Sequence, residues 1–147
     1  MSKGQQADGI LAFYEEERAR ILDACSRCGK CFEVCPMVPH LDLGTRDAAG
    51  IVSDVLSILG RQAGPEAASS AQDALKWMLG CTGSGVCIPA CPESVNPKMM
   101  LRIARITALG GLGDPKLASK PEDPNWFPRI RAFAQMQLSD DEQKEWM

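Results

Sequence analysis

The chain has 147 residues, a formal net charge of −3 at pH 7 and a sequence pI of about 5.2. This length suits one compact domain and is too short for that domain together with a separate catalytic unit. The acidic balance offers no basic field to nucleic acid, and there is neither a run of 18 apolar residues nor a signal-peptide stretch, so we expect no transmembrane segment of its own and a cytoplasmic location.

The first predicted element is a helix over about residues 10–24. Asp8 is a suitable N-cap for it. The acidic run 15–17 precedes Arg18 and Arg20, which is the order that the helix dipole favours. We expect these charged side chains to form a solvated face.

A run of four cysteines follows directly and reads Cys25-Ser-Arg-Cys28-Gly-Lys-Cys31-Phe-Glu-Val-Cys35-Pro36. The pattern is C-x2-C-x2-C-x3-C-P, the ligand run of a bacterial-type iron–sulfur cluster. Clustered cysteines in a reducing compartment bind metal more often than they form disulfides. A structural zinc site uses two separated pairs, which this run is not. The run therefore predicts an iron–sulfur cluster.

Two helices are predicted between this run and a second group of cysteines. Residues 47–59 carry apolar side chains at helical spacing, with Gly60 as the C-cap. A turn at residues 64–65 leads into a second helix over 66–79. We expect Trp77 of that helix to pack near the cluster that the second group of cysteines helps to bind.

The second group reads Cys81-Thr-Gly-Ser84-Gly-Val-Cys87-Ile-Pro-Ala-Cys91-Pro92. It repeats the frame of the first run, except that Ser84 occupies the slot of the second cysteine. The chain is therefore expected to hold two clusters, one of which lacks a thiolate at one corner.

The fourth cysteine of such a run ligates the other cluster in two-cluster ferredoxins. By this rule the first cluster, a [4Fe–4S] cluster, is held by Cys25, Cys28, Cys31 and Cys91. The second cluster is held by Cys35, Cys81 and Cys87. This crossed ligation would tie the two cysteine runs together.

Ser84 decides the nature of the second cluster. A serine alkoxide is a harder and rarer ligand than a thiolate, which favours a [3Fe–4S] cluster with an empty corner beside Ser84. The alternative is a labile [4Fe–4S] cluster in which Ser84 or another non-cysteine group is the ligand. Both alternatives place Ser84 at the cofactor site.

The last predicted elements follow the second cysteine group. Asn96 and Pro97 read as the N-cap and first residue of a helix that reaches about residue 109. A last helix is expected from Pro128, and Ser139 with Glu142 forms a capping box for a terminal helical turn.

No segment shows the alternation of a strand, so the predicted fold class is all-α. We divide the chain into a dicluster domain with its N-terminal helix, residues 1–110, and a Pro-rich C-terminal extension, residues 111–147, which we expect to dock a partner. Five large apolar residues are candidates either for docking or for the core: Met99, Met100, Trp126, Met136 and Trp146.

The ligand pattern over about residues 20–110 resembles the α-helical ferredoxin domain. That domain forms the C-terminal half of the iron–sulfur subunits of succinate dehydrogenase and fumarate reductase, and it also occurs alone in the C-type subunits of heterodisulfide reductases. The plant-type [2Fe–2S] ligand run of the dehydrogenase subunits is not in this sequence, and Ser84 departs from the eight cysteines of typical heterodisulfide reductase C-type subunits. In the dehydrogenase family the equivalent slot is normally not cysteine and the cluster is three-iron. This likeness supports a [3Fe–4S] second cluster here.

The resemblance implies an electron-transfer subunit of a hetero-oligomeric oxidoreductase complex. Its clusters would relay electrons between a flavin-bearing partner and a quinone, a disulfide or another redox subunit, and a membrane-bound partner would make it peripheral to the membrane. We expect no catalysis by the chain alone, because its single histidine, His40, has no obvious partner. The alternative is an iron–sulfur enzyme or sensor that uses the incompletely ligated second cluster.

Overall fold

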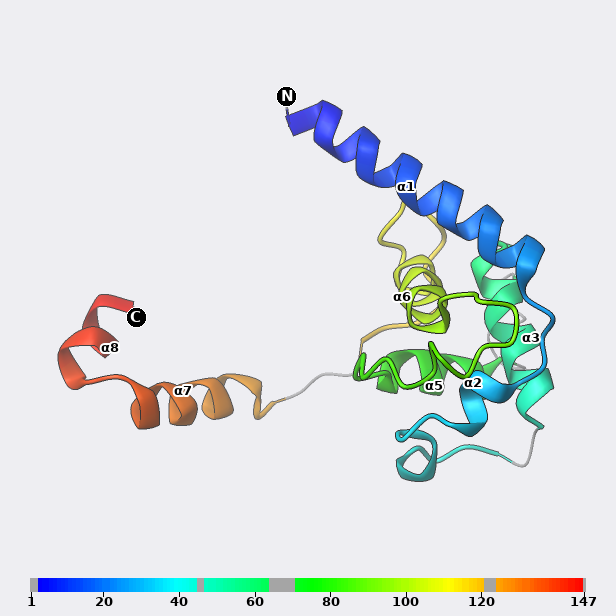
Figure 1. Cartoon of the computed structure of the whole chain (residues 1–147). Helices are drawn as coiled ribbons and strands as arrows, with labels where there is room; N and C mark the ends of the chain where they lie inside the picture. Colours follow the sequence, from blue (N-terminus) through cyan, green and yellow to red (C-terminus); the bar gives the residue numbers. More distant parts are fainter. Residues whose placement is uncertain (1–2, 45–46, 64–70, 121–123, 147) are drawn as a thin grey trace.

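The computed structural model describes residues 3–44, 47–63, 71–120 and 124–146 (Figure 1). These residues form helices and connecting loops without a strand, which confirms the all-α prediction. The helices are α1 (Lys3–Ala24), α2 (Lys30–Glu33), the 3-10 turn η1 (Val38–His40), α3 (Ala48–Leu59), α5 (Gln72–Gly80), α6 (Pro97–Ala108), α7 (Trp126–Gln137) and α8 (Asp140–Trp146).

The core lies where α3, α5 and α6 pack against one another, with α1 across α3 and α6 and the short α2 against α3 (Figure 1). The sequence places apolar side chains at helical spacing on each of the three helices, so each has one face to bury. The largest fully buried side chains include Ile51, Val55, Leu59, Trp77, Met78, Met100 and Ile103. This core forms the floor beneath both cysteine runs.

Helix α1 begins earlier than the sequence predicted. It starts at Lys3, so Asp8 lies inside the helix and not at its N-cap, and the prediction was wrong at this end. Only the C-terminal half of α1 contacts the core, where Ile21 is fully buried, whereas Ile10 and Phe13 are exposed. The cap rule failed because a polar residue that suits an N-cap is also tolerated within an exposed helical turn.

The caps of α3 and α6 follow the prediction. The Asp47 side chain accepts a hydrogen bond from Gly50 N at 2.8 Å, and the Asn96 side chain accepts one from Met99 N at 3.0 Å. Gly60 is the C-cap of α3, as expected, although Arg61 and not Gly60 has the left-handed conformation (φ 58°).

The structure describes the second predicted helix from Gln72 onward. The turn at 64–65 and residues 66–70 lie outside the described residues. The described part of this helix is α5, which ends one residue later than the predicted end.

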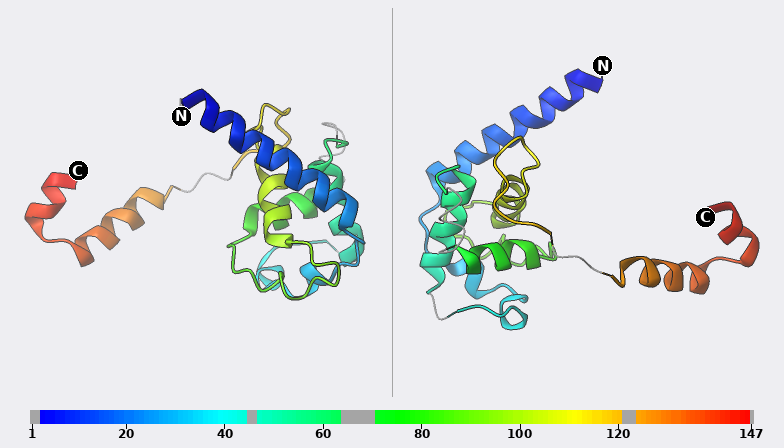
Figure 2. Two further views of the ribbon diagram at one scale, coloured as in Figure 1. Left: turned by 45° about the horizontal axis from the view of Figure 1, so that its top comes forward. Right: turned by 180° about the vertical axis from the view of Figure 1, so that it is seen from behind.

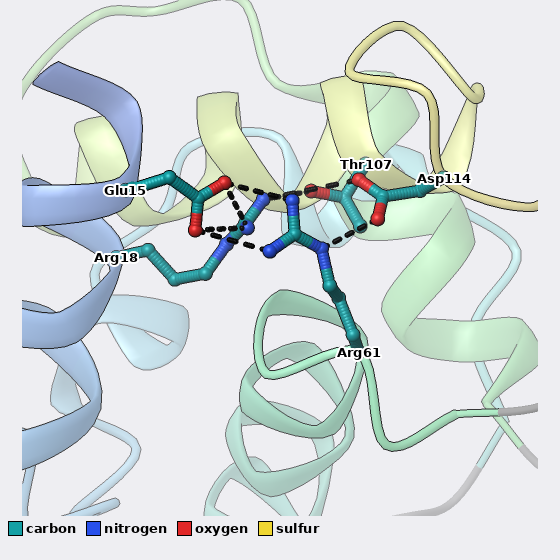
Figure 3. Close-up of polar contacts among 5 residues, drawn as sticks. All are labelled: Glu15, Arg18, Arg61, Thr107 and Asp114. Atoms are coloured by element: carbon teal, nitrogen blue, oxygen red, sulfur yellow. Dashed lines mark hydrogen bonds and ion pairs between the residues drawn. The ribbon is translucent and has the colours of Figure 1, made fainter. Parts of the chain in front are cut away.

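A polar cluster joins segments that are distant in sequence (Figure 3). The Glu15 carboxylate accepts hydrogen bonds from Arg18 at 2.7 Å and from Arg61 at 2.7 Å. Arg18 also donates to Thr107 Oγ1 at 2.9 Å, and Arg61 Nε donates to Asp114. Two cations and two carboxylates thus neutralise one another where α1, the end of α3 and the end of α6 meet.

Residues 114–118 of the predicted C-terminal extension lie against this helical body. Besides the Asp114 contact, Leu117 N and Ala118 N donate to Ala108 O at 2.8 and 3.0 Å. The division of the chain at residue 110 remains a prediction, and the extension that lies apart from the body begins beyond these contacts.

Helices α7 and α8 contact each other and lie apart from the other helices in every view (Figures 1 and 2). The predicted capping box is present, since Ser139 N donates to Glu142 Oε2 at 2.8 Å. Of the five docking or core candidates, Met100 is buried, Met99 is half-buried, and Trp126 and Met136 are exposed; the side chain of Trp146 lies outside the described residues.

Among the described residues, no helix combines the length and the apolar character that a membrane span requires.

Candidate functional site

Both cysteine runs meet at cavities between the ligand loops and the core helices. The first cavity is lined by the thiols that the crossed pairing assigned to one cluster: Cys25, Cys28, Cys31 and Cys91. Cys91 comes from the far end of the second run, about 60 residues from the others in sequence (91 − 31 = 60). Helices α3 and α6 supply the floor through Val52 and Met100. The structure therefore brings together the four cysteines predicted for the first cluster.

The second cavity collects the remaining cysteines. It is lined by Cys35, Cys81, Cys87 and Ser84, and also by Cys31. Ser84 is exposed, so its corner of the cavity faces the solvent. The structure thus groups the three cysteines and the serine that the sequence assigned to the second cluster.

Cys31 lies in the wall between the cavities, which the sequence did not indicate. It lines both cavities and is the one buried cysteine among the seven. Burial, reinforced by the neighbouring Cys25 and Cys87 thiols, raises its pKa to about 12. Because Cys31 lines both cavities, the two groups of thiols adjoin at this residue. At neutral pH this thiol binds iron only with release of its proton.

Burial also raises the pKa of the Cys87 thiol, and the neighbouring Cys81 and Cys35 thiols raise it further. The Lys98 ammonium acts in the opposite direction and lowers this pKa. Lys98 lines the second cavity, and a Cβ atom built on Gly83 would lie 3.6 Å from Lys98 Cε. The cationic side chain of Lys98 therefore lies beside the loop that carries Ser84.

Glycine is required where the first ligand loop meets α3. Gly29 has φ +81°, and a Cβ atom there would lie 2.7 Å from Ala48 Cβ and 2.9 Å from Ala49 N. Both the backbone conformation and the contact exclude a side chain. Arg27 in the same loop is left-handed without being glycine (φ 59°), a strained conformation of the kind that clusters at functional sites.

Trp77 lies at the second cavity beside Cys81, where the sequence predicted it. Its side chain is fully buried and makes an edge-to-face contact with Phe32, with ring centroids 5.0 Å apart. The indole Nε1 is buried without a hydrogen-bond partner among the described residues. An unpaired buried donor costs free energy, and Trp77 lines the cavity in which a bound cluster would carry sulfur acceptors.

The residues present fit two iron–sulfur clusters. Four thiols line the first cavity, and Cys35, Cys81, Cys87, the shared Cys31 and Ser84 line the second. Within the described segments, no three Cys, His, Asp or Glu side chains converge as they do on a single metal ion. The thiols instead surround spaces, which is the arrangement that a polynuclear cluster needs.

The cavities differ in charge, and the two residues responsible were not predicted from the sequence. Apart from the cysteines, Glu93 is the charged residue that lines the first cavity, and Lys98 is the one that lines the second. Neither belongs to a ligand motif, so spacing carried no signal for them. His40 lies on the exposed turn η1 and lines neither cavity.

The comparisons with known proteins agree with this arrangement. A family model described as a 4Fe-4S dicluster domain matches residues 19–92, just over half of the chain and a span that includes all seven cysteines and Ser84. No curated protein and no solved structure matched the chain.

Proposed function

The chain belongs to the 4Fe-4S dicluster domain family, and from this premise we propose that it is an electron-transfer subunit of a larger oxidoreductase complex. Electrons would pass through its two clusters between a flavin-bearing redox protein and a second acceptor such as a quinone, a disulfide or another redox subunit. The resemblance of its ligand pattern to the C-type subunits of heterodisulfide reductases and to the dehydrogenase iron–sulfur subunits supports this role.

The observation that carries the proposal is the pair of adjoining thiol-lined cavities with Cys31 in their common wall. When bound, the clusters supply one-electron redox chemistry. The chain contributes the thiolates that would hold the clusters, a packed floor of core helices, and the Cys31 side chain in the wall that the two cavities share. Two redox groups this close exchange electrons without a moving part, which is the property that a relay needs.

In this proposal the first cluster is a [4Fe–4S] cluster on Cys25, Cys28, Cys31 and Cys91. The second is a [3Fe–4S] cluster on Cys35, Cys81 and Cys87, with Ser84 beside its empty corner. The poor affinity of a serine hydroxyl for iron, relative to a thiolate, supports this choice.

The test is EPR spectroscopy of the anaerobically purified protein, with counts of iron and acid-labile sulfide. We expect about seven irons per chain and a paramagnetic signal in the oxidised protein, since an oxidised three-iron cluster is paramagnetic and an oxidised four-iron cluster of the usual kind is silent. Eight irons with a signal only after reduction would reject the three-iron assignment and keep the relay. Zinc in place of iron and labile sulfide would reject the relay itself.

Assembly with the partner subunits is proposed to use the C-terminal extension. The exposed Trp126, Phe127, Phe133 and Met136 of α7 support this, because a helix with this much uncovered apolar surface gains free energy from a partner. Removal of residues 121–147 should leave iron content unchanged and abolish co-purification of the complex. Removal of residues 111–147 also deletes Asp114 and should destabilise the domain. Loss of iron on removal of residues 121–147 would show that α7 belongs to the cluster domain.

A further inference from the structure

A third cavity lies directly beside the second cluster cavity. It shares five lining residues with its neighbour: Cys81, Thr82, Gly83, Lys98 and Leu101. Its outer wall adds Arg102 and Arg105 of α6. Anything bound in this cavity would therefore adjoin the second cluster cavity, across a wall built by the start of the ligand loop and by Lys98 and Leu101 of α6.

All the charged residues that line this third cavity are basic. Lys98, Arg102 and Arg105 follow one another at spacings of four and three along α6, so they share one face of the helix. Within the described residues, no hydrogen bond or ion pair to a carboxylate is present at any of the three. Arg18 and Arg61, by contrast, each form ion pairs with Glu15 and Asp114.

The charge of this face opposes the charge of the whole chain. A net charge of −3 repels an acidic partner in general, whereas three uncompensated cations at one site attract it in one orientation. Such local complementarity mainly raises the rate of productive encounter and fixes orientation. Here the favoured orientation brings the partner to the second cluster.

We propose that this basic cavity is the docking point for a carboxylate-rich surface of the redox protein that exchanges electrons with the second cluster. The inference rests on the proposed relay function. A protein fits better than a small molecule, because no aromatic ring lines the cavity to grip a small ligand. Lys98 and Arg102 are also exposed, so they reach beyond the cavity to a partner surface.

The experiment uses the full-length protein with its clusters, under anaerobic conditions, and stopped-flow absorbance. The electron donor is an acidic flavodoxin in its fully reduced form; its flavin loses one electron and one cluster of the chain gains it. The variant Arg102→Glu/Arg105→Glu reverses two charges of the cavity. The matched control, Lys116→Glu/Lys120→Glu, makes the same change of net charge at two exposed lysines outside the cavity.

At low ionic strength we expect the cavity variant to react at least tenfold more slowly than the wild type, and the control variant to stay within about threefold of it. The difference should disappear at high salt because the charges are screened. The uncharged pair Arg102→Gln/Arg105→Gln should give an intermediate rate, which guards against misfolding of the charge-reversed variant. Equal slowing in the cavity and control variants, or no slowing in either, would overturn the docking proposal.

A separate reaction tests the relay on which this proposal rests. The uncharged duroquinone should oxidise the dithionite-reduced clusters at the same rate in every variant, because charge does not steer it. If duroquinone draws electrons from the protein and the acidic probe does not distinguish the variants, the docking site is wrong and the relay stands. If no electrons pass to duroquinone from the reduced, fully loaded protein, the relay fails and the docking proposal fails with it.

Discussion

The two cluster cavities differ in their surroundings more than in their ligand frames. The first has four thiols, and its charged neighbour is Glu93. The second has a serine in one ligand slot, and its lining includes Lys98 and Trp77, whose buried indole N–H has no hydrogen-bond partner among the described residues. The two cavities thus have similar cysteine patterns but neighbouring charges of opposite sign.

This difference predicts the direction of electron flow. A reduced cluster carries one more negative charge than an oxidised one, so a nearby cation or hydrogen-bond donor stabilises the reduced state and a nearby carboxylate destabilises it. We therefore expect the second cluster to have the higher reduction potential. Electrons would pass from the first cluster to the second, beside the basic cavity.

The largest expected effect comes from exchanging the cysteines that cross between the cavities. Cys35→Ser should remove the second cluster and keep the first, and Cys91→Ser should do the reverse, because each thiol lines the cavity of the other run. The two variants are matched, since each cysteine is the last of its run and precedes a proline. Iron counts and EPR of the oxidised and reduced proteins separate the two losses. Selective loss of the first cluster in Cys35→Ser would break the crossed scheme.

The next effect concerns the fit of the first ligand loop on α3. Gly29→Ala should destabilise the protein by about 3 kcal/mol, because it combines a left-handed conformation with a clash against Ala48. Gly113→Ala is the matched control: it has the same φ of +81° with no atom within 4 Å of the added Cβ, and should cost about 1 kcal/mol. Anaerobic urea unfolding followed by circular dichroism measures both. Equal losses of stability in the two variants would show that the close packing of Gly29 on α3 contributes nothing to the free energy of unfolding.

The effect of the neighbouring charges on the reduction potentials is tested by removing the charge of Lys98 and that of Glu93 in separate variants. Lys98→Met should lower the reduction potential of the second cluster, and Glu93→Gln should raise that of the first, each by on the order of 50 mV because both residues are exposed and screened. Potentiometric titration monitored by EPR resolves the two clusters, so the undisturbed cluster serves as the internal reference. A shift of the same sign in both variants would contradict the proposed electrostatic origin.

The smallest expected effect belongs to Trp77. Trp77→Phe keeps an aromatic ring against Phe32 and removes the buried N–H donor. It should lower the potential of the second cluster by on the order of 30 mV, which corresponds to the loss of a single hydrogen bond. An unchanged potential in the same titration, with normal iron content, would mean that the indole N–H does not serve the cluster.

The sequence predicted the helices with regular apolar spacing and the caps at Asp47 and Asn96, because short-range periodicity and local hydrogen bonds decide these features. It failed at the start of α1, where no core contact fixes the boundary and the exposed helix continues back to Lys3. The grouping of the cysteines was also accessible from sequence, since a ligand run of fixed spacing constrains which thiols can reach one site.

Only the tertiary structure assigned Cys31 to the wall between the cavities, and Glu93 and Lys98 to opposite sites. The pairing of Arg61 with Glu15 and Asp114 is equally invisible in sequence, because it joins residues 46 and 53 positions apart. Charge placement of this kind depends on how α6 crosses α1 and α3, and packing, not local spacing, sets that crossing. The sequence by itself therefore predicted the grouping of the cysteines and determined the helical class, and the packing of the helices decided the electrostatic surroundings of each site.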